Sequence, residues 1–200
     1  MAHIFMIGAT GGIGSRLVPM LADKGHRITA LHRKPEQAET LRKAGAEPVQ
    51  GDLMEMGVDD FAAAAKGADY AVFSAGAAGS GKERTTAIDG EAPIKLIEAA
   101  RQTGLKRIYM VSAIPDAGRD RERNEGFEHY MSTKKKADVA LVESGIDYVI
   151  VRPGTLQDDD GDGRVTAGRV VAYGDVARGN VAAMLAELID TPEGTCEIIE

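Results

Sequence analysis

The sequence predicts an α/β fold in which a doubly wound, mainly parallel sheet forms a single domain over residues 1–200. Short apolar runs alternate with amphipathic stretches, which is the pattern of strands joined by crossover helices. The first apolar run, residues 4–7, leads into glycines at a spacing of three (Gly8, Gly11 and Gly14) and then into a helical pattern. A chain of 200 residues also suits one domain with its own core.

The other elements follow from the same patterns. Strands are expected at residues 27–31, 47–50, 68–73, 106–113, 146–151, around Val170 and at 196–199. Helices are expected at 15–22, 36–44, 58–66, 85–103, 127–138 and 174–189. Several of these helices are followed by glycine, which favours the left-handed conformation that ends a helix. Residues from about 152 onward are expected to add a small substrate-side region.

Composition excludes several classes of function. The net charge of −7 argues against nucleic-acid or anionic-membrane partners. No apolar run reaches the roughly 18 residues of a membrane span, and the N-terminus lacks the features of a secretory signal, so a cytoplasmic location is expected. The single cysteine, Cys196, excludes an internal disulfide and is expected to be a small buried residue. The acidic run 158–163 lacks the final glutamate of a calcium loop, so a solvated turn and no metal site are expected.

The glycine-rich turn has the composition of a phosphate-binding turn. Backbone N–H groups at a helix N-terminus can meet a dinucleotide pyrophosphate, and glycine lets the backbone come close. The expected contacts lie in residues 8–14: Gly8, Thr10, Gly11, Gly12, Ile13 and Gly14. Gly8 would make the tight turn, Gly11 the phosphate approach and Gly14 the close contact between helix and strand. A tight turn without a ligand is the alternative.

Two basic residues follow the second expected strand. In a dinucleotide-binding fold this strand end faces the adenosine ribose, where an acid selects NAD and a base accommodates the 2′-phosphate of NADP. The chain has Arg33 and Lys34 here and no acid. Because a guanidinium can grip a phosphate with two N–H groups, Arg33 is the main candidate, and NADP(H) is favoured over NAD(H). A solvated basic loop is the alternative.

Two further segments carry candidate site residues. Ser74, Ala75 and Gly76 follow the fourth expected strand, where small residues let a cofactor ribose approach; a merely flexible loop is the alternative. Tyr130 and Lys134 lie four residues apart, on one face of a helix, where the lysine would stabilise a phenolate. A Tyr130 packed at the helix edge with a solvated Lys134 is the alternative. The charged segment 115–125 is expected to act as a lid or substrate contact.

Three segments together resemble the atypical short-chain dehydrogenase/reductases. They are Gly-Ala-Thr-Gly-Gly-Ile-Gly at 8–14, Ser112 with Tyr130 and Lys134, and Ser-Gly-Ile-Asp-Tyr-Val-Ile-Val-Arg-Pro-Gly at 144–154. The compact chain is similar to the Rossmann-like NAD(P)-binding proteins among them, including flavin or biliverdin reductase-like and NAD-dependent epimerase/dehydratase-like proteins. Asp-Val-Ala at 175–177 also resembles the start of a helix in these relatives.

The resemblance implies roles for further residues. Asp52 and Leu53 would lie beside the adenine, although Asp52 is equally suited to cap a helix. Ser112, Tyr130 and Lys134 would be the catalytic residues, with Lys134 also bonded to the nicotinamide ribose. In the relatives the Arg-Pro-Gly turn borders the nicotinamide, which gives Arg152 and Pro153 a cofactor role; a structural ion pair is the alternative for Arg152.

These expectations converge on an NADP(H)-dependent oxidoreductase that transfers hydride to a small carbonyl, quinone or flavin-like acceptor. A dinucleotide and a small-molecule substrate would be its partners. Two alternatives stay open. One is an NAD(P)-dependent epimerase or dehydratase that uses Tyr130 as a base, and the other is a redox sensor that binds NADP(H) without turnover.

Overall fold

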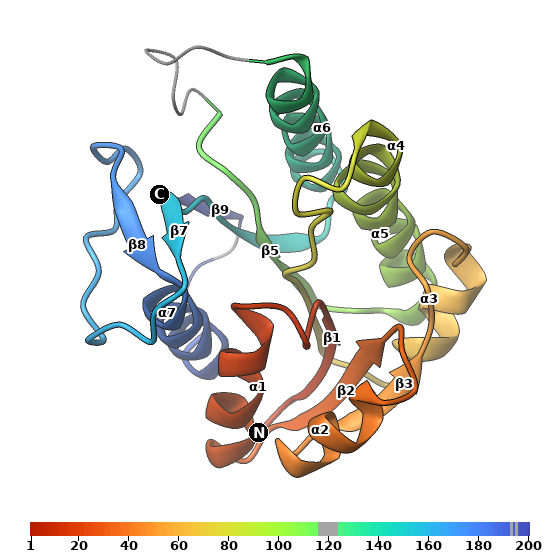
Figure 1. The fold of residues 1–200 in the computed structure, drawn as a ribbon. Helices are drawn as coiled ribbons and strands as arrows, with labels where there is room; N and C mark the ends of the chain where they lie inside the picture. The colour runs from red at the N-terminus through yellow and green to blue at the C-terminus, as the bar shows by residue number, and fades with distance from the viewer. Residues whose placement is uncertain (116–123, 193, 195) are drawn as a thin grey trace.

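The computed structural model describes residues 1–115, 124–192, 194 and 196–200. Its centre is a seven-stranded sheet in the order β3-β2-β1-β4-β5-β6-β9, and every neighbouring pair is parallel. Helices cover both faces of the sheet (Figure 1). The doubly wound parallel α/β fold predicted from the alternating patterns is therefore confirmed.

The elements have the following bounds. The strands of the large sheet are β1 His3–Ile7, β2 Arg27–His32, β3 Glu47–Gln50, β4 Tyr70–Phe73, β5 Arg107–Val111, β6 Asp147–Val151 and β9 Glu197–Ile199. A separate pair is formed by β7 Thr155–Gln157 and β8 Asp175–Ala177. The helices are α1 Gly14–Asp23, α2 Gln37–Lys43, α3 Val58–Ala64, α4 Lys82–Arg84, the π-helix η1 Thr85–Glu91, α5 Ala92–Thr103, α6 Glu125–Val142 and α7 Arg178–Asp190.

Strand β1 shows why the sheet is covered on both faces. Ile4 and Met6 pack into one core cluster with residues of α1, α2 and α7, while Phe5 and Ile7 pack into a second cluster with α3, α5 and α6. All four side chains are fully buried. Because successive side chains of a strand point to opposite faces, a continuous apolar run fits a strand between two helical layers.

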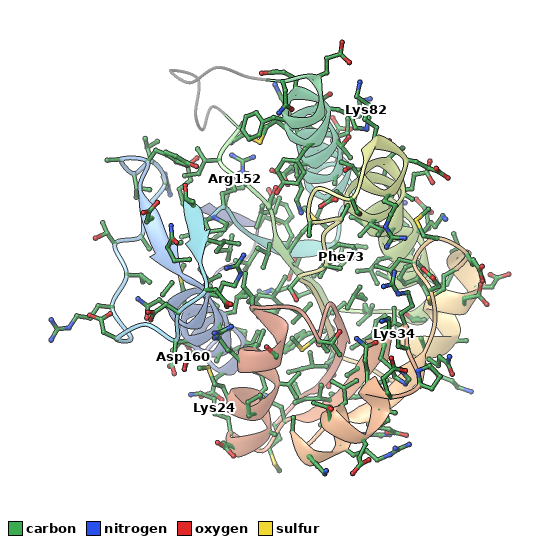
Figure 2. All side chains as sticks on the ribbon, in the orientation of Figure 1. Lys24, Lys34, Phe73, Lys82, Arg152 and Asp160 are labelled. Carbon is green, nitrogen blue, oxygen red and sulfur yellow. The ribbon has the colours of Figure 1, made fainter. Side chains whose placement is uncertain are left out.

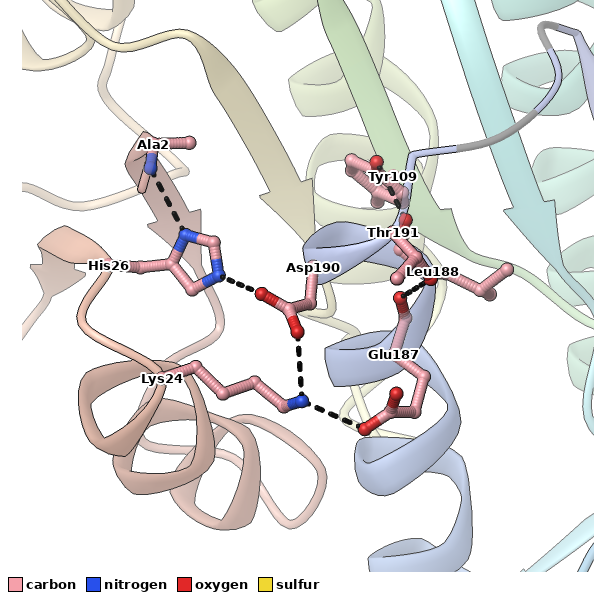
Figure 3. Close-up of polar contacts among 8 residues, drawn as sticks. All are labelled: Ala2, Lys24, His26, Tyr109, Glu187, Leu188, Asp190 and Thr191. Atoms are coloured by element: carbon pink, nitrogen blue, oxygen red, sulfur yellow. Dashed lines mark hydrogen bonds and ion pairs between the residues drawn. The ribbon is translucent and has the colours of Figure 1, made fainter.

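Polar contacts join α7 to the end of α1 (Figure 3). Lys24 Nζ lies 2.9 Å from Glu187 and 3.1 Å from Asp190, and the ring of His26 lies 3.5 Å from Asp190. The hydrogen bond and charge of Lys24 lower the pKa of the Asp190 carboxyl. These contacts hold α7 against the end of α1, in addition to the apolar packing of α7 on the sheet.

The C-terminal region differs from the sequence prediction in three places. The strand expected around Val170 is absent. Val170 is 86% exposed and lies in an irregular segment, so this apolar residue is not part of the core. The expected helix at 174–189 begins only at Arg178, because residues 175–177 pair with β7 as β8. Cys196 is exposed and not buried, in the short connection that leads into β9.

The expected helix at 85–103 is also interrupted. Its first part is the π-helix η1, which buries Thr85, Ile88 and Asp89, and a regular helix begins only at Ala92. Such wide turns are frequent at functional sites. The segment 115–125, expected as a lid, lies mainly outside the described residues. None of the helices in the described part of the chain is long and apolar enough to cross a membrane.

Candidate functional site

A cleft of about 930 Å³ opens at the carboxyl ends of β1, β2, β4 and β5. It includes the point between β1 and β4 where the strand order reverses, which is where ligands bind in open parallel sheets. Most of the predicted site residues line it: Gly8, Thr10, Gly11, Gly12, Ile13, Arg33, Asp52, Leu53, Ser74, Ala75, Gly76, Ser112, Tyr130 and Lys134. Gly14, Lys34, Arg152 and Pro153 are not among the lining residues.

The glycine-rich turn is shaped in a way that side chains would prevent. Gly8 has a φ of +87°, and a Cβ there would lie 2.5 Å from the backbone nitrogen of Ala75. A Cβ at Gly14 would lie 2.8 Å from Cα of Ala9, so α1 packs against the turn only with glycine at this position. The Gly11 amide donates to Gly8 O at 2.9 Å and closes the turn. This bare backbone at the start of α1 fits a dinucleotide pyrophosphate.

The next segment along the cleft contains the basic loop. The exposed side chain of Arg33 lines the cleft, whereas Lys34 Nζ lies 4.0 Å from Glu36 and outside it, on the β2–β3 side of the molecule (Figure 2). Gln37 accepts hydrogen bonds from the amides of both residues and donates to Thr10 Oγ1 at 3.1 Å. Gln37, which was not among the predicted site residues, therefore connects the basic loop to the glycine-rich turn.

Asp52 lines the cleft but does not cap a helix. Its Oδ1 accepts a hydrogen bond from the Met54 amide at 3.0 Å and stabilises the turn after β3. Helix α3 instead begins after Gly57, whose amide donates to Asp60. The capping alternative for Asp52 is therefore wrong.

Lys134 is buried beneath the cleft rather than solvated. Its side chain is 8% exposed, and Nζ donates to Val111 O at 3.0 Å and lies 3.4 Å from Asp89 Oδ1. Asp89 is 1% exposed, and its other oxygen accepts from the Ala77 amide at 2.9 Å. The pair therefore connects α6, η1 and the small-residue loop after β4.

Tyr130 differs from the expectation of a lysine-stabilised phenolate. Burial, followed by the negative charges of Asp89 and Asp138, raises the pKa of Tyr130 to about 12. The charge of Lys134 is directed at Asp89 and Val111 and is not among the causes that act on Tyr130. The phenol therefore stays protonated at neutral pH, and its raised pKa makes it a weaker proton donor than a free phenol.

Ser112 and Asp138 form the next layer below. Ser112 is 5% exposed, and its Oγ has no hydrogen-bond partner of good geometry, although the hydroxyl lies close enough to Asp138 to affect it. Burial raises the pKa of Asp138, while Ser112 and Arg152 oppose this rise.

Arg152 makes a structural ion pair. Its Nε and Nη2 donate to Asp138 Oδ2 at 3.0 and 2.8 Å, and its Nη1 lies 3.9 Å from Glu200. These contacts direct the guanidinium to α6 and the C-terminus and away from the cleft. Of the two interpretations of Arg152, the ion pair is the one that the geometry supports.

The acidic run 158–163 is exposed but not merely solvated. Asp158 and Asp160 form ion pairs with Arg16 of α1 at 3.3 and 2.7 Å. Asp162 accepts a hydrogen bond from Asn180 of α7 at 3.3 Å. In the described residues, no group of His, Cys, Asp and Glu side chains is arranged to hold a metal ion.

Four charged residues of the cleft were not among the predicted site residues: Lys82, Arg84, Asp89 and Arg178. A signal for Asp89 exists, because positions 89, 92 and 96 fall on one helical face and the other two are apolar. A carboxylate on an apolar face needs a buried partner. Arg178 had no such signal, because it lies far along the chain from the turn it contacts.

A comparison with protein families decides the affiliation of the chain. A family model described as NAD(P)H-binding matches residues 8–192. The chain belongs to this NAD(P)H-binding family. A nicotinamide dinucleotide is therefore the class of cofactor, in agreement with the glycine-rich turn and the cleft beside it.

Several proteins similar to this chain carry the names of enzymes. "Uncharacterized sugar epimerase YhfK" of Bacillus subtilis is 41% identical over 189 residues, which cover 94% of this chain and 87% of that protein. A solved structure of a putative NAD-dependent epimerase/dehydratase from Bacillus halodurans is 33% identical with a TM-score of 0.90, covering 100% and 93% of the two chains. The oxidoreductase ylbE of Lactococcus lactis is 25% identical with a TM-score of 0.84, covering 98% and 89%.

Proposed function

We propose that the protein is an NADP(H)-dependent reductase that acts on a small carbonyl, quinone or flavin-like acceptor. The observation that carries this proposal is the position of Tyr130 and Lys134 in the cleft that begins at the glycine-rich turn. A bound reduced nicotinamide supplies the hydride for this chemistry. The phenol of Tyr130 is protonated at neutral pH and can donate its proton to the acceptor oxygen as that oxygen takes on negative charge.

The other residues of the inner cleft would bind and orient the cofactor and the acceptor. Lys134 is held by Val111 O and Asp89, and its ammonium has a third N–H to offer a ribose hydroxyl. Ser112 lines the same part of the cleft, and its hydroxyl would donate to the acceptor oxygen. Because these groups are buried and fixed by packing, they are oriented before a ligand arrives, which lowers the cost of binding.

An epimerase or dehydratase is the second candidate, favoured by the names of the relatives from the two Bacillus species. Such an enzyme needs Tyr130 as a base, and a base works best with a pKa near the working pH. The pKa of Tyr130, raised to about 12, opposes that role.

A redox sensor that binds NADP(H) without turnover is the third candidate. It differs from the other two in that no substrate would be converted.

Turnover tests the proposal. Purified protein is mixed with NADPH and a panel of flavins, quinones and small aldehydes, and absorbance at 340 nm is followed for the wild type and Tyr130→Phe. We expect acceptor-dependent oxidation that falls roughly 100-fold or more in Tyr130→Phe, because general-acid catalysis contributes typically 10²–10⁴-fold. Turnover that survives this change would instead indicate hydride transfer without help from Tyr130. Tight binding without turnover on any acceptor would favour the sensor.

Cofactor choice gives a second prediction. Arg33→Ala should weaken NADPH binding roughly 10- to 100-fold, because a hydrogen bond to a charged group contributes about 1.5–3 kcal/mol. NADH, which lacks the 2′-phosphate, should bind equally to both proteins. Lys34→Ala is the matched control and should change little, because Lys34 lies outside the cleft beside Glu36. Equal losses for NADPH and NADH in Arg33→Ala would contradict the preference for NADP(H).

A further inference from the structure

Arg178 lies across the glycine-rich turn. It is the first residue of α7, and its side chain lines the cleft. A Cβ placed at Gly12 would lie 2.8 Å from Arg178 Nε, so the stem of the arginine rests directly on the backbone of Gly12. Nη1 donates to Leu156 O at 3.3 Å and holds the guanidinium between β7 and the turn. The outer part of the side chain is therefore held on one side by the Gly12 backbone and on the other by Leu156 O.

In the part of the chain that the structure describes, the charge of Arg178 has no acidic partner, in contrast to those of Arg16 on the facing helix and Lys82 across the cleft. Arg16 forms ion pairs with Asp158 and Asp160, and Lys82 forms one with Glu125. Within the described residues, Arg178 is in no such pair, and its one hydrogen bond to a carbonyl leaves most of its five N–H donors free. A fixed, half-buried guanidinium beside a phosphate-binding turn is suited to an anion with two accepting oxygens.

We propose that Arg178 binds the pyrophosphate of the dinucleotide and closes the cleft from the side of α7. This inference rests on the proposed binding of NADP(H), and it assigns the C-terminal region a direct contact with the cofactor. It also gives Gly12 a second reason to lack a side chain: the turn must admit the arginine as well as the phosphates. The amides at the start of α1 and the guanidinium of Arg178 then act on the same charged group.

The test compares the dissociation constants of NADPH and NADH, measured by titration calorimetry, for the wild type, Arg178→Met and Arg178→Lys. Both dinucleotides contain the pyrophosphate. Arg178→Met keeps the apolar stem over Gly12 and should weaken both by the same factor, roughly 10- to 100-fold. Arg178→Lys keeps the charge without the planar fork and should fall between. Arg33→Ala provides the contrast, since it should affect NADPH alone.

The outcomes separate the inference from the proposed function. Unchanged binding of both dinucleotides to Arg178→Met would overturn the inference and leave NADP(H) binding standing. A loss confined to NADPH would also overturn it, because Arg178 would then contact the 2′-phosphate. Failure of the wild type to bind either dinucleotide would overturn both proposals. If Arg178→Met does not fold, as judged by thermal unfolding without ligand, Arg178→Lys decides, and unchanged binding there would count against the inference.

Discussion

Replacement of Asp89 by alanine should lower the free energy of unfolding by about 3–5 kcal/mol, since removal of one partner of a buried ion pair leaves the other charge uncompensated. Asp89 and Lys134 are both buried, and among the described residues the Lys134 ammonium would keep only the Val111 carbonyl as a partner. The substitution also removes the acceptor of the Ala77 amide and releases the small-residue loop beside the cleft.

Urea unfolding followed by circular dichroism measures this effect. The double variant Asp89→Ala/Lys134→Met should recover much of the loss, because neither charge is then left buried alone. Glu91→Ala, at an exposed position of the same π-helix, is the matched control and should lie within about 0.5 kcal/mol of the wild type. A loss of less than 1 kcal/mol in Asp89→Ala would show that the pair contributes little to the fold.

The second large effect is expected at Gly14. A methyl group there would lie 2.8 Å from Cα of Ala9, against backbone that cannot move without shifting the turn. Overpacking of this kind costs about 1–3 kcal/mol. Because α1 must move away from β1, the turn loses its shape, and we expect Gly14→Ala to lose NADPH binding by at least tenfold.

Titration calorimetry with NADPH and urea unfolding of Gly14→Ala test the two parts of this prediction. Gly174→Ala is the control, because a Cβ at Gly174 would meet nothing within 4 Å, and both binding and stability should be retained. Wild-type affinity for NADPH in Gly14→Ala would contradict the account of how the turn is built. A loss of stability with unchanged binding would show that the packing contact and the phosphate site are independent.

The strand and helix pattern could be predicted because it depends on local chemistry. The run from Ile4 to Ile7 is apolar at every position. A run this short is too short for a buried helix, and it fits a strand that is covered on both faces. The same reasoning was wrong at Val170, where an apolar residue lies in a solvated segment. Short apolar signals near the end of the chain carry less information, since they lack the flanking pattern of a βα unit.

The inner end of the cleft could be predicted only in part. The spacing of Tyr130 and Lys134 correctly places both on α6, but the partner of the lysine comes from η1, 45 residues earlier in the chain. Sequence spacing reports neighbours within one element and not contacts between elements. For the same reason Arg178, which meets Gly12 from the opposite end of the chain, was not among the predicted residues.

The most direct test of the central claim locates the cofactor on the protein. Hydrogen–deuterium exchange is followed by mass spectrometry with and without NADPH. We expect slower exchange in peptides that cover residues 8–14 and 74–81, which contribute most of their residues to the cleft lining. We expect no change in residues 60–66, which border a second groove on the far side of β3 and do not line the cleft. Protection at that groove, or none anywhere at saturating NADPH, would contradict the placement of the dinucleotide in the cleft.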